Sequence, residues 1–199
     1  MNRLLVLAAL LLAPLAATAA MHALVVEGLA GDPGYGEQFE RQSRRVAEAL
    51  ESLADGGDTQ LLRGDGATRD AVLERLAALQ GELASSDQVV LVLVGHGSYD
   101  DYEYKFNLPG PDLTGEDIVA ALDALPAGTQ ILVNTSSASG AMAERAAADG
   151  RIVVLATRSG AERHATRFGN FFADALADAA AAHARMESSG HIGKIVLKV

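Results

Sequence analysis

Five short runs of strand-like composition, separated by segments of helical character, constrain the fold of this chain more than any other feature. Residues 89–94 contain only Val and Leu, a composition typical of a central parallel strand that is buried on both faces. Four other runs of strand-like composition occupy residues 22–27, 59–63, 131–134 and 151–157. Strands that alternate with single helices imply right-handed βαβ units, in which parallel strands lie between layers of helices. The pattern therefore predicts an α/β fold, a three-layer α/β/α sandwich.

The segments between these runs carry helix signals. Apolar side chains recur at helical spacing within residues 37–53. Thr68 is placed to cap a second helix, and Thr114, with an Asp three residues later, has the pattern that starts a third. Residues 95–113 are polar and are expected to form a long loop. Residues 192–199 have strand-like composition and would complete a mostly parallel six-stranded sheet.

The first twenty residues have the three-part pattern of a secretory signal peptide. Arg3 supplies a positive charge, residues 4–15 form an apolar core, and Ala17-Thr18-Ala19 is a small-residue cleavage site. The core is shorter than the roughly twenty residues that a membrane-spanning helix needs, so cleavage is favoured over retention as an anchor. We expect residues 1–20 to be removed and the protein to be periplasmic or secreted.

Composition limits the number of domains and the classes of partner. Residues 21–199 are enough for one domain with a sizeable core. The chain has 16 Lys and Arg against 26 Asp and Glu, a net charge of −10. Nucleic acids and anionic membranes need clustered positive charge, so neither is expected as a partner, and no stable membrane insertion is expected. The absence of Cys excludes disulfides and thiolate metal sites; we expect no metal and no other cofactor.

Two polar turns follow expected strands. His96 and Gly97 come directly after the run 89–94, and Ser136 and Ser137 follow the next strand along the chain. Ligands of parallel sheets bind beyond the carboxyl ends of the strands, where a Ser hydroxyl with a nearby base is a nucleophile and glycine N–H groups can hold an oxyanion. The ordinary alternatives are a turn histidine that bonds to backbone and serines that cap a helix.

These turns resemble the catalytic motifs of the caspase–legumain superfamily of cysteine peptidases. Gly95-His96-Gly97 is similar to the histidine turn of that family, and Ser137-Ala138-Ser139-Gly140 is similar to the legumain-type Cys-x-Ser-Gly. The resemblance covers about residues 22 to 180, most of the expected domain. It includes the opening strand and helix, the strand that follows the nucleophile, and the closing Phe-rich helix, which are residues 22–53, 151–162 and 168–176.

The resemblance implies a caspase-like fold, peptide or protein substrates and a set of site residues. Ser137 would attack the peptide bond, His96 would shuttle the proton, and Gly97 with the backbone of Ser137 would hold the oxyanion. The residues implied for substrate binding are Thr135, Arg158 and Ser159. Arg158 would pair with an acidic substrate side chain through its planar guanidinium; alternatively, it is a surface residue beside Glu162.

The chain departs from the family at the nucleophile, because Ser137 stands where the family has Cys. A thiol is partly ionised at neutral pH, whereas a hydroxyl needs a general base throughout. Two functions therefore stay open: a peptidase that hydrolyses peptide bonds by acyl transfer, and a catalytically inactive pseudopeptidase that binds peptides in the same cleft. Ser136, one residue out of register, is the alternative nucleophile position. A serine esterase is less favoured because a Gly-x-Ser-x-Gly motif is lacking.

The loop after His96 contains candidate supporting residues. Asp100, Asp101 and Glu103 could orient the histidine, although acidic loop residues are commonly only solvated. Tyr102 and Tyr104 are among several aromatics there, and aromatic side chains beside a cleft suggest peptide or glycan contact. Packing over the edge of the sheet is the alternative.

The segment 184–199 is similar to the closing segment of medium-chain quinone reductases. No Gly-x-Gly-x-x-Gly dinucleotide fingerprint accompanies it, so it implies no nucleotide cofactor. The role of this tail stays open.

Overall fold

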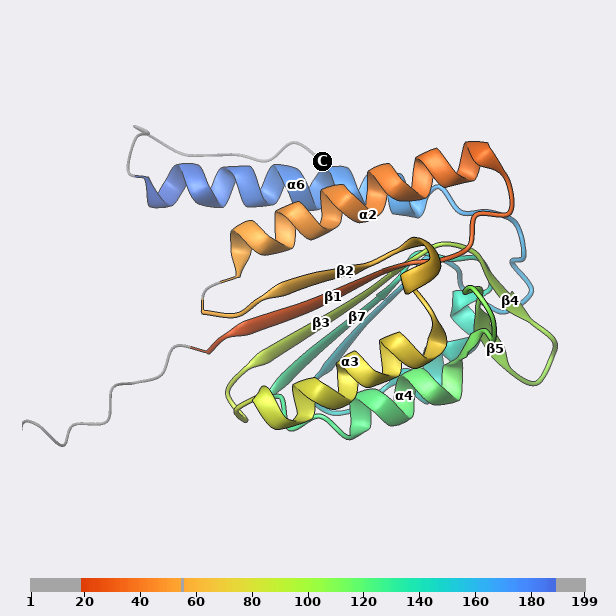
Figure 1. Ribbon diagram of the computed structural model, residues 1–199, viewed down its shortest axis with the longest axis horizontal. Helices are drawn as coiled ribbons and strands as arrows, with labels where there is room; N and C mark the ends of the chain where they lie inside the picture. Colours follow the sequence, from red (N-terminus) through yellow and green to blue (C-terminus); the bar gives the residue numbers. More distant parts are fainter. Residues whose placement is uncertain (1–18, 55, 189–199) are drawn as a thin grey trace, which may run out of the picture.

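A parallel sheet forms the centre of the protein in the computed structural model, which describes residues 19–54 and 56–188 (Figure 1). The strands are β1 (Met21–Glu27), β2 (Thr59–Leu62), β3 (Gln88–Val94), β7 (Thr129–Asn134) and β8 (Arg151–Leu155). Their order in the described sheet is β2-β1-β3-β7-β8, and every neighbouring pair is parallel. The expected mostly parallel sheet is confirmed with five strands. The expected sixth strand, at residues 192–199, lies outside the described residues, as does nearly all of the expected signal peptide.

Helices cover both faces of the sheet. Helices α2 (Pro33–Leu53) and α6 (Phe168–Glu187) lie on one face, and α3 (Arg69–Glu82) and α4 (Gly115–Asp123) lie on the other (Figure 1). Successive side chains of a strand point to opposite faces, and this alternation divides the interior into two cores. Leu91 of β3 belongs to the core beneath α3 and α4, whereas Val92 belongs to the core beneath α2. The layered α/β arrangement agrees with the expectation from the sequence.

The helix starts follow local capping chemistry. Thr68 caps α3 by accepting a hydrogen bond from the Ala71 N–H, and Thr114 and Asp117 form a reciprocal capping box at α4. Both starts agree with the sequence. Helix α2 begins four residues earlier than expected, because the Asp32 carboxylate accepts the N–H of Tyr35 and a proline occupies the first turn.

The segment after β3 is more ordered than the expected long loop. It contains β4 (Gly97–Tyr99), β5 (Tyr104–Phe106) and β6 (Leu113–Thr114), which form a small antiparallel sheet. Tyr104 and Phe106 are both buried against the core beneath α3 and α4. Strands this short carry too little pattern to be recognised, and burial of the two aromatic rings holds them in place. The hairpin lies beside the carboxyl ends of the main strands (Figure 1).

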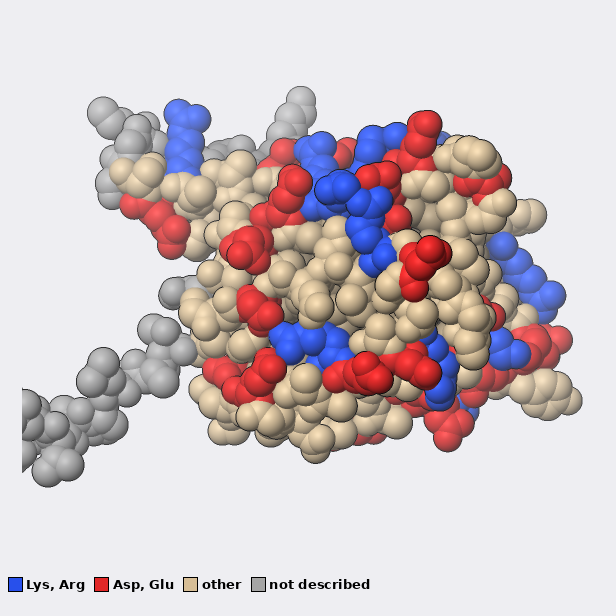
Figure 2. All heavy atoms as spheres, in the orientation of Figure 1, with Lys and Arg blue, Asp and Glu red and all other residues tan. Residues whose placement is uncertain are grey.

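Acidic and basic side chains are interspersed on the face drawn in Figure 2. Many are paired on or beside α2; examples are Arg41 with Glu37, and Arg44 and Arg63 with Glu40. The paired arginines lower the pKa of the Glu40 carboxyl, Arg44 first. Within the described residues, no helix has the length and apolar character needed to cross a membrane.

Candidate active site at the carboxyl edge of the sheet

The two polar turns meet because β3 and β7 are neighbours. Leu93 lies opposite Asn134 in the register of these strands, and the N–H of Thr135 donates to the Leu93 carbonyl at 3.0 Å. The residues after each strand therefore leave the sheet side by side. This places His96 and Gly97 next to Ser136 and Ser137, at the edge where parallel sheets bind ligands.

Ser137 is bound to the backbone of Gly97 in both directions. Its hydroxyl donates to the Gly97 carbonyl at 2.8 Å and accepts the Gly97 N–H at 3.3 Å. The residue is 3% exposed. The proton that a general base would have to remove is held by a carbonyl, and the N–H expected to stabilise an oxyanion is directed at the same hydroxyl. We call this reciprocal pair the Ser137–Gly97 clip.

Gly97 is required at this position by its surroundings. A Cβ placed there would lie 2.5 Å from Ser136 Oγ and 2.7 Å from both the Ser137 carbonyl oxygen and Tyr104 Oη. These atoms belong to a buried hydrogen-bonded network and cannot withdraw like the end of a flexible surface side chain. The glycine allows the histidine turn to approach the serine turn.

The His96 ring packs against helix α2. Its centroid lies 4.6 Å from that of Tyr35 and 4.9 Å from that of Phe39, both edge to face, a favourable aromatic geometry. The residue is half-buried. Within the described residues, the ring makes no hydrogen bond to Ser137 or to any other group. The structure thus brings the two residues to adjacent turns without joining the imidazole to the hydroxyl.

Ser136 belongs to a closed network on the opposite face of the sheet. Its hydroxyl donates to Asn134 Oδ1 at 2.8 Å and lies 2.6 Å from Tyr104 Oη, while Asn134 Nδ2 donates to that same phenol oxygen at 2.9 Å. Burial raises the pKa of Tyr104 to about 12. The contact between Tyr104 and Ser136 could not be predicted from the sequence; the signal in the pattern was a polar Asn at the end of a buried strand.

Thr135 faces the same side of the sheet as His96. Its hydroxyl donates to the Leu93 carbonyl at 2.9 Å, and its own carbonyl accepts the Thr166 hydroxyl at 2.5 Å. It lines a narrow cavity together with Gln42, His96 and Thr166. Thr135 is 4% exposed, and its hydroxyl is already engaged with the Leu93 carbonyl.

The turn after β7 is tied to the loop after β8. Thr157 Oγ1 accepts the Gly140 N–H at 2.8 Å, and the Thr157 N–H donates to Ser139 Oγ at 3.2 Å. The N–H of Ala138 donates to the carbonyl of Glu162 at 2.8 Å. Strand β8 ends at Leu155, two residues before the end expected from the sequence, because Thr157 turns away to make these bonds.

Arg158 and Ser159 lie on the outer surface of this loop. The Arg158 side chain is 96% exposed, and its Nε lies 3.4 Å from a carboxylate oxygen of Glu162. Ser159 is exposed, and its hydroxyl accepts the Ala161 N–H at 3.3 Å. Neither lines the open pocket of about 450 Å³ on this side of the protein, which is bordered by Thr157, Glu162, His164, Thr166 and Phe168 among others.

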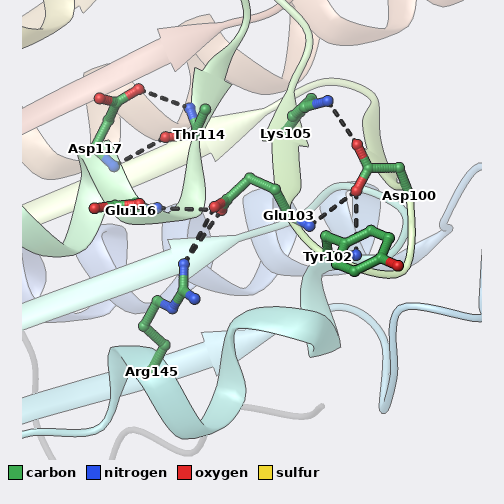
Figure 3. Close-up of polar contacts among 8 residues, drawn as sticks. All are labelled: Asp100, Tyr102, Glu103, Lys105, Thr114, Glu116, Asp117 and Arg145. Carbon is green, nitrogen blue, oxygen red and sulfur yellow. Dashed lines mark hydrogen bonds and ion pairs between the residues drawn. The ribbon is translucent and has the colours of Figure 1, made fainter.

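The hairpin loop is held by its own acidic residues (Figure 3). Asp100 accepts the N–H groups of Tyr102 and Glu103 and pairs with Lys105 at 2.7 Å. The hydrogen bond from Lys105, with those from the two backbone groups, lowers the pKa of Asp100 to about 2. Glu103 pairs with Arg145 at 3.2 Å. The candidates for orienting His96 are thus engaged elsewhere: Asp100 within the hairpin, Glu103 with α5 (Ala143–Ala146), and Asp101 with Arg163 at 3.4 Å.

The described residues contain no group of three or more His, Cys, Asp or Glu side chains arranged to hold a metal ion. No protein-family model matches the chain, and no curated protein matches it. Among solved structures, it is similar to the crystal structure of protein GSU0716 from Geobacter sulfurreducens, with 18% identity and a TM-score of 0.47. The match covers 90% of this chain and 68% of that one. A similarity of this degree assigns neither a family nor a function.

Proposed function

We propose that this protein is an exported pseudopeptidase of the caspase–legumain type, which binds extended peptides at the carboxyl edge of its sheet and does not cleave them. The observation that carries the proposal is the Ser137–Gly97 clip. The sheet order and the positions of the two turns support the resemblance, and the clip supports the loss of chemistry.

Acyl transfer makes three demands that the clip opposes. The hydroxyl proton must pass to a base within hydrogen-bond reach, the oxygen must be accessible to a substrate carbonyl, and an N–H must be free for the oxyanion. Here the proton is directed to the Gly97 carbonyl, Ser137 is 3% exposed, and the Gly97 N–H already donates to the hydroxyl. The His96 ring is held by two aromatic rings of α2 instead.

Peptide binding uses the groups that remain accessible at this edge. Thr166 borders both the narrow cavity lined by the half-buried His96 ring and the pocket after β8. The exposed guanidinium of Arg158 adds a planar donor for an acidic peptide side chain. In the proposed complex, an extended peptide contacts the ring, the pocket and the guanidinium.

Hydrolysis is the second candidate, supported by the placement of His96 and Ser137 on neighbouring turns. It requires Ser137 to leave the clip and His96 to leave its packing against α2. A fluorophosphonate probe distinguishes the two functions, because it labels only an activated serine. We expect no labelling of the wild type. Labelling that disappears in both Ser137→Ala and His96→Ala would establish the hydrolase.

Cysteine substitution tests the register of the site. In a pseudopeptidase, neither Ser137→Cys nor the matched Ser136→Cys should gain amidase activity, and both thiols should alkylate slowly because both positions are buried. Amidase activity in Ser137→Cys alone would indicate an intact peptidase site that lacks only its thiol. Activity in Ser136→Cys alone would move the nucleophile position by one residue.

Binding is tested with a library of extended peptides that vary in acidic content. Arg158→Ala should weaken the affinity for acidic peptides about tenfold, the loss expected for one charge-assisted contact. Arg41→Ala is the matched control, since Arg41 also forms an exposed pair with a carboxylate four residues away but lies on α2. If Arg158→Ala and Arg41→Ala bind acidic peptides with equal affinity, or if the wild type binds no peptide, the proposed binding site is excluded.

A further inference from the structure

Asp87 is a buried carboxylate without a cationic partner among the described residues. It directly precedes β3 and is 7% exposed. Its two oxygens accept backbone N–H groups, from Ala84 at 2.7 Å and from Ala20 at 3.0 Å. These two donors, Ala84 first, lower the pKa of the carboxyl, so it is ionised at neutral pH. A buried charge is normally paired with an opposite charge, and here the pairing is missing.

Ala20 is fixed at the start of the sheet. Its carbonyl accepts the N–H of Gln88 at 2.8 Å, and Met21 then pairs with Gln88 in the register of β1 and β3. Ala19 is exposed. The amide bond between Ala19 and Ala20 is also the bond that follows the small residues Ala17 and Ala19, which have the spacing of a signal-peptidase site.

We propose that the chain is cut between Ala19 and Ala20, and that the new α-ammonium group of Ala20 forms the missing ion pair with Asp87. A signal peptidase of the exporting cell adds water across this amide. Ala19 leaves as a carboxylate, and the Ala20 nitrogen becomes an amine that binds a proton. That nitrogen already lies 3.0 Å from Asp87 Oδ1, so cleavage replaces a neutral amide donor to the carboxylate with a charged ammonium donor at the same position.

The structure favours this bond over its neighbour. A cut after Ala20, the boundary expected from the sequence, would remove the N–H that Asp87 accepts and the carbonyl that accepts the Gln88 N–H. Both groups would then need new partners. A cut between Thr18 and Ala19 would place the new ammonium group on Ala19, one residue away from the Ala20 N–H that Asp87 binds. The site lies at the opposite end of the sheet from the β4–β5 hairpin (Figure 1), so it is independent of peptide binding.

The ion pair makes stability depend on pH in a defined window. The carboxylate raises the pKa of the α-ammonium above its usual value of about 7.7–8.0. A raised pKa contributes stability that is complete below the unfolded value and is lost as pH rises through the folded value. The nearby titratable groups are His22, which lowers the pKa of Asp87, and Asp58, which pairs with His22 and Arg75.

Two experiments test the proposal. In the first, the full-length chain is exported by a bacterial host, and its N-terminus is determined by intact mass and sequencing. We expect the mature chain to begin at Ala20. A chain that begins at Met21, or that keeps its first residues, would overturn the proposed cut.

In the second experiment, the chain that begins at Ala20 is compared with the same chain acetylated at its N-terminus. We expect the free amine to unfold about 2–4 °C higher at pH 7, and the difference to disappear as the pH is raised above the titration of the amine. Asp87→Asn should abolish the difference, whereas Asp58→Asn should retain it. If Asp87→Asn does not fold, the α-amino pKa of the wild type, measured by NMR, is decisive. An unshifted pKa, or equal unfolding temperatures at pH 7, would exclude the ion pair.

Discussion

Removal of the Tyr104 hydroxyl isolates the energy of the network that joins the hairpin to β7. Tyr104→Phe keeps the aromatic ring, which is 2% exposed, and deletes only the oxygen. Asn134 Nδ2 then loses its 2.9 Å partner and keeps only a 3.6 Å contact with Met142 Sδ. Ser136 loses the 2.6 Å contact but still donates to Asn134 Oδ1.

The expected magnitude follows from these losses. Each of the two hydrogen bonds contributes about 0.5–1.5 kcal/mol, and the unpaired buried amide hydrogen places the total toward the upper end. We therefore expect Tyr104→Phe to lower the free energy of unfolding by about 2–3 kcal/mol. In a protein of this size, that corresponds to a fall of about 4–12 °C in the unfolding temperature. Urea denaturation followed by circular dichroism measures the change directly.

Tyr102→Phe is the matched control, because Tyr102 belongs to the same hairpin and is 89% exposed. Its effect should stay within about 0.5 kcal/mol, as for most surface substitutions. Ser136→Ala should be strongly non-additive with Tyr104→Phe, since both changes break one network. A loss below about 0.5 kcal/mol in Tyr104→Phe, or full additivity of the two changes, would refute the network as described.

Three further predictions concern glycines and titration. Gly97→Ala should destabilise the protein by about 3 kcal/mol or more, because the added methyl group overpacks the site. Gly81→Ala, at an exposed helix position with open space, should stabilise it by about 0.5–1 kcal/mol. Equal changes in unfolding free energy for the two variants would refute the contrast. Asp117→Ala should cost about 1 kcal/mol at pH 7, because it removes one half of the capping box that Asp117 forms with Thr114. Arg69 lowers the pKa of Asp117 to about 2. The difference in unfolding free energy between the wild type and Asp117→Ala should therefore shrink as the pH falls from 3.8 toward 2. Burial raises the pKa of Tyr104 from 10 to about 12. The contribution of the neutral phenol to stability is therefore complete below pH 10 and is lost as the pH rises through about 12. Tyr104→Phe should show a weaker decline of stability in alkaline denaturation.

Most strands of the main sheet were predictable because they contain apolar runs rich in Val, Leu and Ile; β2, with the sequence Thr-Gln-Leu-Leu, has the weakest pattern of the five. Residues 89–94 were expected as a buried central strand, and β3 spans Gln88–Val94 with its last six residues buried. The small strands of the hairpin were not predictable, because Gly97–Tyr99 and Tyr104–Phe106 are too short to show a pattern. Pairing and aromatic burial define them, and both are tertiary effects.

The location of the candidate site was predictable from topology, but its contacts were not. Strand order brings the turns of His96 and Ser137 together, and the apolar residues of β3 and β7 indicate that both turns follow buried strands. The direction of the His96 ring depends on Tyr35 and Phe39, which come from a helix far away in sequence. Ser137 bonds to backbone atoms of Gly97, and backbone partners leave no trace in residue identities.

The bonds around residues 134–140 link three segments that are distant in sequence. Tyr104 ties the hairpin to Asn134 and Ser136, while Thr157 ties the loop after β8 to the turn after Ser137. Each of these hydrogen bonds ends within residues 134–140, so neither the hairpin nor the loop after β8 can open without breaking a hydrogen bond to that segment. Amide hydrogens in all three segments should therefore exchange with solvent as one cooperative unit. A peptide that rigidifies one loop would slow exchange in the other two.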